Sequence, residues 1–226
     1  FRSPTAIGDN TFWTQAANFY NDVTQSGVGK PVDANYNRSS MRFLPVSDGI
    51  PNGCTILSAK LTLNAHDPAV VYTNVNVDVK IYGNDADDAA APTDLAGANG
   101  LSLTTESVEW HDIPVWIDGT NYDSPDITDI IQEIIDRTGY ADTSAIQLVI
   151  HDDGSTNGHG RFYHNYKHAA NVAPVLTVTF SNVYEISTPY TEAELFELSF
   201  AQSADTLFIA HPSHKPMELT RTDHTA

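Results

Sequence analysis

The chain has 226 residues, with 29 acidic and 11 basic side chains and a formal net charge of −18. So few lysines and arginines cannot neutralise a run of phosphates, and no apolar stretch reaches about 18 residues, so we expect neither nucleic-acid binding nor membrane insertion. The hydrophobic share of 41% is enough for a folded core, whereas the single cysteine, Cys54, allows neither an internal disulfide nor a cysteine-based zinc site.

Residues 1–180 have the pattern of β-structure, because short runs with every second residue apolar recur between turn-rich spacers. In such a run one face of the strand points to the core and the other to water. The spacer 83–100 is acidic and rich in alanine, which predicts a long surface loop. The clearest predicted strands are residues 55–64, 75–82, 145–150 and 175–180.

One segment breaks this alternation and has the spacing of an amphipathic helix. Isoleucine occurs at positions 127, 130, 131, 134 and 135, which places all five side chains on one helical face. Ser124 is the predicted N-cap, Pro125 suits the first helical position, and Gly139 follows the last turn. We expect the isoleucine face to pack against a sheet.

The character of the sequence changes between residues 181 and 186, which predicts two domains, 1–182 and 183–226. The chain starts at Phe1 without a signal-peptide pattern and stops abruptly at Ala226. We therefore expect it to be a processed form or a part of a longer polypeptide.

The region 183–226 has the pattern of a small α+β extension. Thr191 and Glu194 have the spacing of a capping box, which predicts a short helix ending near Leu198, and the alternating run 203–210 predicts a strand. About 40 residues are too few for a core of their own. The extension is therefore expected to dock on the first domain, on another subunit or on further chain.

A resemblance covers roughly residues 1–180. Its motifs are, in order, Met41-Arg42-Phe43, the run from Ile50-Pro51-Asn52-Gly53 to Leu61, Trp116, the isoleucine helix, Ala145 to Ile150, Arg161-Phe162-Tyr163 and Ala173-Pro174 to Val178. This order is similar to the DNRLRE-type, carbohydrate-binding-module-like jelly rolls of secreted and surface proteins. The resemblance implies a mainly β fold, namely a jelly-roll β-sandwich with one packed amphipathic helix.

A second resemblance covers about residues 184–226. Its motifs are Thr188-Pro189-Tyr190 with the following Thr191 to Leu195, Gln202-Ser203-Ala204-Asp205, His211-Pro212 and Leu219-Thr220-Arg221. These residues resemble a module of large virion-associated proteins of tailed bacteriophages and related prophages. In that family the module sits inside a longer chain, and a jelly roll does not usually precede it directly. The resemblance implies a structural role in a virion.

Sugar binding requires exposed aromatic rings beside polar groups, and the candidate platforms are Trp13, Trp110 and Tyr163. Trp13 and Trp110 lie in polar stretches, which favours exposure. Burial in the core is the alternative for each ring. Trp116, between Val115 and Ile117, is expected to belong to the core.

Asp152 and Asp153, followed by Gly154, form a turn-rich loop with oxygen ligands of the kind that calcium accepts. The resembled jelly rolls include examples with structural calcium, which makes calcium a possible cofactor here. Four histidines lie nearby in the sequence and allow a transition metal instead, although hydrogen-bonded surface histidines are the alternative: His151, His159, His164 and His168.

The sequence does not favour an enzyme. It has no G-x-S-x-G nucleophile elbow or other local catalytic signature. Five carboxylates crowd one region and allow a glycoside-hydrolase pair, but solvated loop acids are the preferred interpretation: Glu106, Glu109, Asp112, Asp118 and Asp123.

These observations predict a non-enzymatic structural or attachment protein of a bacteriophage virion, located in a tail, fibre or related external assembly. We expect a homo-oligomer that contacts other virion or surface-assembly proteins and a cell-surface glycan, and a location in the virion or outside the cell. Because copies with a charge of −18 repel one another, assembly is expected to depend on salt or calcium. The alternative is a secreted or cell-surface carbohydrate-binding module without a virion role.

Overall fold

The computed structural model describes residues 9–14, 18–32, 35–45, 49–66, 76–168, 172–181 and 187–220, with the side chains of 32 and 35–37 left aside. The chain divides into two compact units, Phe1–Val183 and Tyr184–Ala226, and each is described by itself. None of the helices in these ranges combines the length and the apolar character of a membrane span.

The first unit is a mainly β sandwich, as predicted. Antiparallel pairing joins its strands in the order β11-β5-β10-β3-β4-β9-β6-β7, with β1 paired to β4, β2 to β1 and β8 to β5. The strands are β1 (Asn10–Thr14), β2 (Phe19–Tyr20), β3 (Gln25–Val32), β4 (Asn35–Phe43), β5 (Thr55–His66), β6 (Val77–Asn84), β7 (Leu103–Ile113), β8 (Asn121–Asp123), β9 (Ile146–Asp152), β10 (His159–His164) and β11 (Val175–Ser181). The four predicted strands are confirmed.

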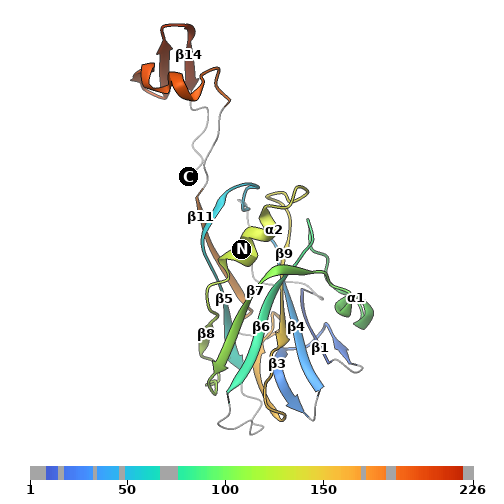
Figure 1. The fold of residues 1–226 in the computed structure, drawn as a ribbon. Coiled ribbons are helices and arrows are strands. Elements are labelled where there is room, and N and C mark those ends of the chain that lie inside the picture. The colour runs from blue at the N-terminus through green and yellow to red at the C-terminus, as the bar shows by residue number, and fades with distance from the viewer. Residues whose placement is uncertain are drawn as a thin grey trace. The chain divides into compact units, whose positions relative to one another are not determined.

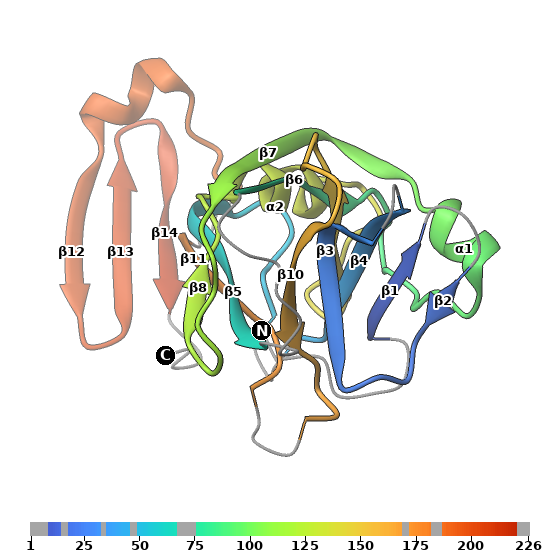
Figure 2. The same cartoon turned by 90° about the horizontal axis from the view of Figure 1, so that it is seen from below.

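The main core lies inside this curved sheet, where α2 (Thr128–Ile135) packs against β5, β6 and β7 (Figure 1 and Figure 2). The predicted isoleucine face is confirmed, since all five isoleucines are at most 1% exposed. Ile134 lies so close to β6 that a Cβ on Gly83 would stand 2.6 Å from its Cδ1 atom. The strands contribute their alternate apolar residues to the same core, among them Met41, Leu61, Leu63, Val79, Ile81, Leu148 and Ile150.

The helix begins later than the predicted Ser124 cap. The Ser124 hydroxyl accepts a hydrogen bond from the backbone N–H of Leu61 (3.0 Å), and the Ile127 N–H donates to the carbonyl of Ala59 (2.9 Å). Residues 124–127 are therefore held along β5 before the helix starts. Gly139 lies beyond the end of α2, and a Cβ there would stand 2.1 Å from the Asp87 carboxylate.

A second, smaller core covers the outer face of β4, β9 and β6. It contains Trp13, Val149 and Ala98, and Ala98 comes from a short helix, α1 (Leu95–Asn99), that the sequence interpretation missed within the predicted loop 83–100. Because both faces of β9 are covered, its residues 146–150 are all buried. Buried polar side chains form a hydrogen-bonded chain on this outer face: Thr11 with Ser40, Ser40 with Gln147, and Gln147 with Asn84.

The second unit contains a 3-10 helix, Glu192–Glu197, and a three-stranded antiparallel sheet of β12 (Ser199–Ser203), β13 (Thr206–His211) and β14 (His214–Thr220). The capping box is confirmed, because Thr191 and Glu194 make both reciprocal hydrogen bonds. The alternating run 203–210 is not one strand, since a turn at 204–205 separates β12 from β13.

Candidate functional site

A β-bulge brings several charged side chains together where β6 and β7 pair. Val77 lies opposite Ile113 and Val79 opposite Trp110, so His111 and Asp112 both face Asp78. Asp112 has a left-handed backbone (φ +56°), and its N–H donates to the Asp78 carboxylate (2.7 Å). The bulge therefore fixes His111 and Asp112 on β7, the last strand in the pairing order.

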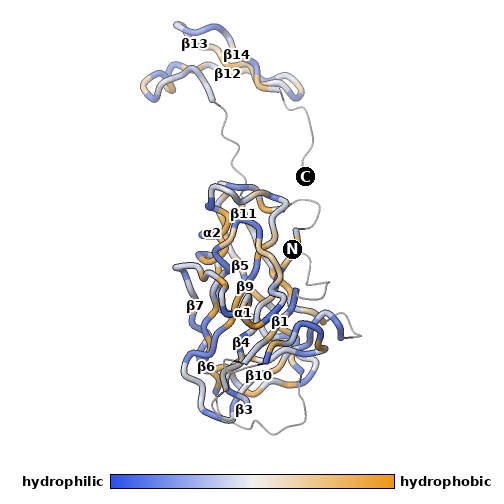
Figure 3. Tube along the Cα trace, turned by 90° about the vertical axis from the view of Figure 1, so that its right-hand side faces the viewer, coloured by the Kyte–Doolittle hydropathy of each residue, from blue (hydrophilic) through white to orange (hydrophobic). Residues whose placement is uncertain are grey.

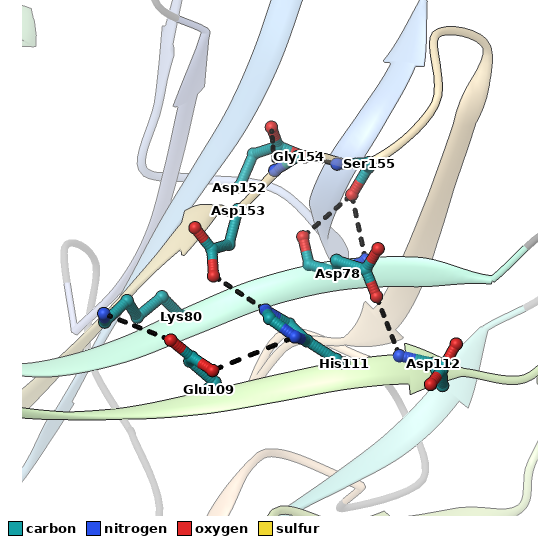
Figure 4. Close-up of polar contacts among 9 residues, drawn as sticks. All are labelled: Asp78, Lys80, Glu109, His111, Asp112, Asp152, Asp153, Gly154 and Ser155. Atoms are coloured by element: carbon teal, nitrogen blue, oxygen red, sulfur yellow. Dashed lines mark hydrogen bonds and ion pairs between the residues drawn. The ribbon is translucent and has the colours of Figure 1, made fainter.

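His111 is the centre of a group that we call the His111 cluster: Asp78, Lys80, Glu109, His111 and Asp153 (Figure 4). Its Nε2 atom lies 2.7 Å from Asp153 Oδ2, and its Nδ1 atom lies 4.0 Å from Glu109 Oε2. The other oxygen of Glu109 lies 3.7 Å from Lys80 Nζ. The hydrogen bond to Asp153 raises the pKa of His111, and the negative charges of Asp78, Asp153 and Glu109 add to this rise.

Asp152 and Asp153, the predicted calcium ligands, both make contacts within the protein. The Asp152 carboxylate accepts hydrogen bonds from the N–H groups of Gly154 (3.3 Å) and Ser155 (3.2 Å), and it lies 3.4 Å from Lys30 Nζ. Asp153 pairs with His111 instead (Figure 4). Neither carboxylate belongs to a group of three possible metal ligands within the described ranges. Calcium binding at this loop therefore stays a prediction, and both aspartates make protein contacts of their own.

The loop that carries these aspartates is fixed to β6. The Ser155 hydroxyl donates to the Asp78 carbonyl (2.9 Å) and accepts from the Asp78 N–H (3.1 Å). The N–H of Asp153 also donates to the Asp78 carbonyl (2.9 Å). Asp153 thus reaches His111 from a position set by backbone contacts.

Two of the three predicted sugar platforms are wrong. Trp13 and Tyr163 are both 0% exposed, so neither ring offers a face to a ligand. Trp13 belongs to the second core, and its indole N–H donates to Asn99 Oδ1 (2.9 Å). Burial raises the pKa of Tyr163 to about 12.

Trp110 is the predicted platform that keeps part of its surface exposed. Its ring lies 6.1 Å from that of Trp116, which in turn stacks on Tyr122 at 5.1 Å. Trp116 is 7% exposed and belongs to the core, as predicted. The neighbouring Val115 and Ile117 are 47% and 69% exposed, so an apolar rim adjoins this aromatic group.

Three of the five carboxylates considered as hydrolase candidates make contacts of different kinds. Glu109 contacts Lys80, and Asp112 accepts a hydrogen bond from the Asn76 amide (2.8 Å). Asp123 accepts from Lys60 and Thr62, at 2.6 Å each. Lys60 and Thr62 together keep the pKa of Asp123 low, so this carboxylate is ionised and does not serve as a proton donor near neutral pH.

The sequence interpretation missed a row of polar pairs between β5 and β8. Thr62 bonds Asp123, and Asn64 donates to Asn121 Oδ1 (2.7 Å). The signal was present as alternating polar residues on the solvent face of β5. A groove of about 230 Å³ adjoins this row and is lined by Thr62, Asn64, Gly119, Asn121, Val172, Ala173 and Val175.

The four histidines considered as metal ligands are brought together only in part. The rings of His164 and His168 lie 3.7 Å apart, whereas His151 packs against Tyr82 at 5.5 Å. Burial lowers the pKa of His151 to about 4.

No protein-family model matches the chain, and a search of curated proteins found no match either.

Proposed function

We propose that the chain is a non-enzymatic structural and attachment subunit of an extracellular assembly, with a bacteriophage virion as the setting that the sequence resemblance favours. In this proposal the first unit is displayed and the second unit binds a second copy of the chain. The observation that carries the proposal is the apolar sheet face of the second unit.

This face can be defined from the strand register. Phe200, Ile209 and Met217 lie directly opposite one another on β12, β13 and β14, and Leu207 lies opposite Leu219. Residues directly opposite in an antiparallel sheet point to the same side. We call this set of five residues the apolar face.

Three residues of the apolar face are open to solvent, and the other two, Leu207 and Ile209, are half-buried. Phe200 is 62% exposed, and Met217 and Leu219 are 40% exposed each. No apolar side chain of residues 187–220 is buried, and apolar stretches alternate with polar ones along β12–β14 (Figure 3). A unit of this size needs a partner to bury apolar area, because it has no core of its own.

A second copy of the same face is the partner that fits best. Most of the surface of a chain with charge −18 repels another copy, so contact requires a patch where apolar residues replace charges. A two-fold interface brings the same patch of both copies together, and an apolar patch is complementary to itself. The charged Glu218 lies on the other side of the sheet, opposite Phe208.

Two matched variants test this proposal. Phe200→Glu places a charge on the apolar face, whereas Phe208→Glu places the same charge on the opposite face of the same sheet at a residue that is 39% exposed. We expect light scattering to give a defined oligomer for the wild type and for Phe208→Glu, and a shift to the 24.6 kDa monomer for Phe200→Glu. An oligomer that both variants preserve would contradict the proposed interface.

A carbohydrate-binding module without a role in assembly is the second candidate. The partly exposed Trp110, with its apolar rim at Val115 and Ile117, favours this candidate. This candidate predicts a 24.6 kDa monomer that binds a polysaccharide and loses that binding when Trp110 is replaced by alanine.

A further inference from the structure

Three histidines and one aspartate gather on the face of the β5–β10 pair opposite the core, and we call them the His66 cluster: His66, Asp118, His164 and His168. His66 lies opposite Phe162 in the register, so His164 is its diagonal neighbour on the same face. The two rings are 4.7 Å apart. The core residues Ala65 and Tyr163 point to the other side of the pair.

Asp118 belongs to a loop that the structure holds against β5. The N–H of Ala65 donates to the Thr120 carbonyl (2.8 Å), and the N–H of Gly119 donates to the Ala65 carbonyl (2.9 Å). The Asn64 amide also donates to the Gly119 carbonyl (3.0 Å). Gly119 has a φ of +73°, the left-handed conformation that glycine adopts without strain.

Buried Arg161 fixes the start of the same loop. Its guanidinium donates to the carbonyls of Ile113 (2.8 Å) and Pro114 (2.6 Å). The position of Asp118 is therefore set from both sides of the loop before any ligand binds, and pre-organisation of this kind favours ligand binding.

The distances in the cluster fit an ion better than a hydrogen bond. Asp118 Oδ1 lies 3.8 Å from His66 Nδ1 and 3.8 Å from His164 Nε2, too far for a hydrogen bond. The three ligand atoms all lie within 4.8 Å of one another. In a tetrahedral zinc site, bonds of about 2.0–2.2 Å keep ligand atoms roughly 3.3–3.5 Å apart. The two Asp118 distances therefore need to contract by a few tenths of an ångström, and the two histidine nitrogens, within 4.8 Å of each other, by at most about 1.5 Å.

His164 is the most buried member of the cluster. The residue is 5% exposed and its Nε2 atom faces Asp118, whereas its Nδ1 atom, on the other side of the ring, is buried without a hydrogen-bond partner. The ring of His168 lies 3.7 Å from that of His164 at a tilt of 38°, and the His168 Nδ1 atom also lacks a partner.

A comparable group in the second unit, Glu194, His211 and His214, makes hydrogen bonds of its own, although the buried His211 Nε2 atom has no hydrogen-bond partner and lies 3.4 Å from Glu197 Oε2. The Nδ1 atom of His211 accepts a hydrogen bond from the Ser213 N–H (3.1 Å), so the neutral ring carries its proton on Nε2, where the metal would bind. His214 Nε2 and Glu194 Oε1 are 3.0 Å apart, a normal hydrogen bond. This group therefore serves as the control.

We propose that His66, Asp118 and His164 bind a divalent transition-metal ion of the zinc class, with one coordination position left for water. Two imidazoles and one carboxylate suit zinc or cobalt, whereas calcium and magnesium prefer oxygen ligands throughout. The ion links the end of β5, the end of β10 and the loop at Asp118. This inference is independent of the proposed assembly.

The test uses the full chain, freed of metal with a chelator and titrated with Co²⁺, whose tetrahedral complexes absorb visible light. We expect one equivalent to bind and Zn²⁺ to displace it. His66→Gln and Asp118→Asn should each weaken binding by more than about 100-fold, because loss of a direct ligand exceeds the 10–100-fold effect of outer-shell changes. The control His214→Gln should leave binding unchanged.

Two results would overturn the inference: the absence of a tetrahedral Co²⁺ spectrum in the wild type, or binding that persists in both His66→Gln and Asp118→Asn. Circular dichroism of the metal-free variants checks the fold. Asp118 has an exposed side chain, so its replacement tests the site even if His66→Gln unfolds. Zinc should raise the melting temperature of the wild type and of His214→Gln but not of Asp118→Asn.

Discussion

At the scale of single residues, the contact between His111 and Asp153 depends on the protonation of His111. His111 lies at the bulge between β6 and β7, and Asp153 reaches it from a loop that Ser155 fixes to β6. The charges around His111 are mixed, because Glu109 also contacts Lys80. Protonation of His111 turns the hydrogen bond to Asp153 into an ion pair.

We predict that His111 titrates above its ordinary pKa of 6.5 and that Asp153→Asn lowers this pKa towards 6.5, because it removes the largest cause of the rise. The stabilising contact is fully present below pH 6.5 and is lost as the pH rises through the raised pKa of the folded state. NMR titration of the His111 ring measures the shift. Glu109→Gln is the control and should lower the pKa less; an unchanged pKa in Asp153→Asn would contradict the assignment.

Trp13 shows why polar neighbours in the sequence did not suffice to identify an exposed sugar platform. Trp13 lies among polar residues, which favoured exposure, but two of these, Asn10 and Thr11, are buried too, and Thr11 bonds Ser40. The second core that covers Trp13 includes Ala98 of α1, from a segment predicted to be a loop. Burial on both faces of β4 and β9 is a tertiary property that the sequence around Trp13 does not encode.

At the scale of elements, α2 connects the sheet and the core. Its isoleucine spacing predicted the buried face correctly, because side chains three and four apart share one side of a helix. The start of the helix was not predictable in the same way. Ser124 is of a residue type that often caps helices, but its hydroxyl accepts a hydrogen bond from Leu61 of β5 instead. The alternating strands were also predicted correctly. The two-residue period of apolar side chains along a strand, like the spacing along a helix, can be read from the local sequence.

We predict that Ile134→Ala destabilises the first unit by about 2–5 kcal/mol, the range for deleting a large buried aliphatic side chain, because it leaves a cavity between α2 and Gly83 of β6. Urea denaturation followed by circular dichroism measures the loss. Asp129→Ala, at an exposed position in the first turn of α2, should cost about 1 kcal/mol or less. Equal effects of the two variants would contradict the packing of α2.

At the scale of the whole molecule, two features act against each other. The net charge of −18 drives copies apart, whereas the apolar face of the second unit, from Phe200 to Leu219, favours their association. Salt screens the first effect and leaves the second intact or slightly strengthened. Association through the apolar face should therefore increase with salt, the opposite of what an interface of ion pairs would give.

The native mass of the wild-type chain tests the central proposal most directly. We expect sedimentation equilibrium over a concentration series to give a single defined multiple of 24.6 kDa, reached at lower protein concentration in 500 mM than in 50 mM sodium chloride. A mass of 24.6 kDa at every concentration and at both salt concentrations would contradict the structural-subunit account and leave the carbohydrate-binding module as the better one.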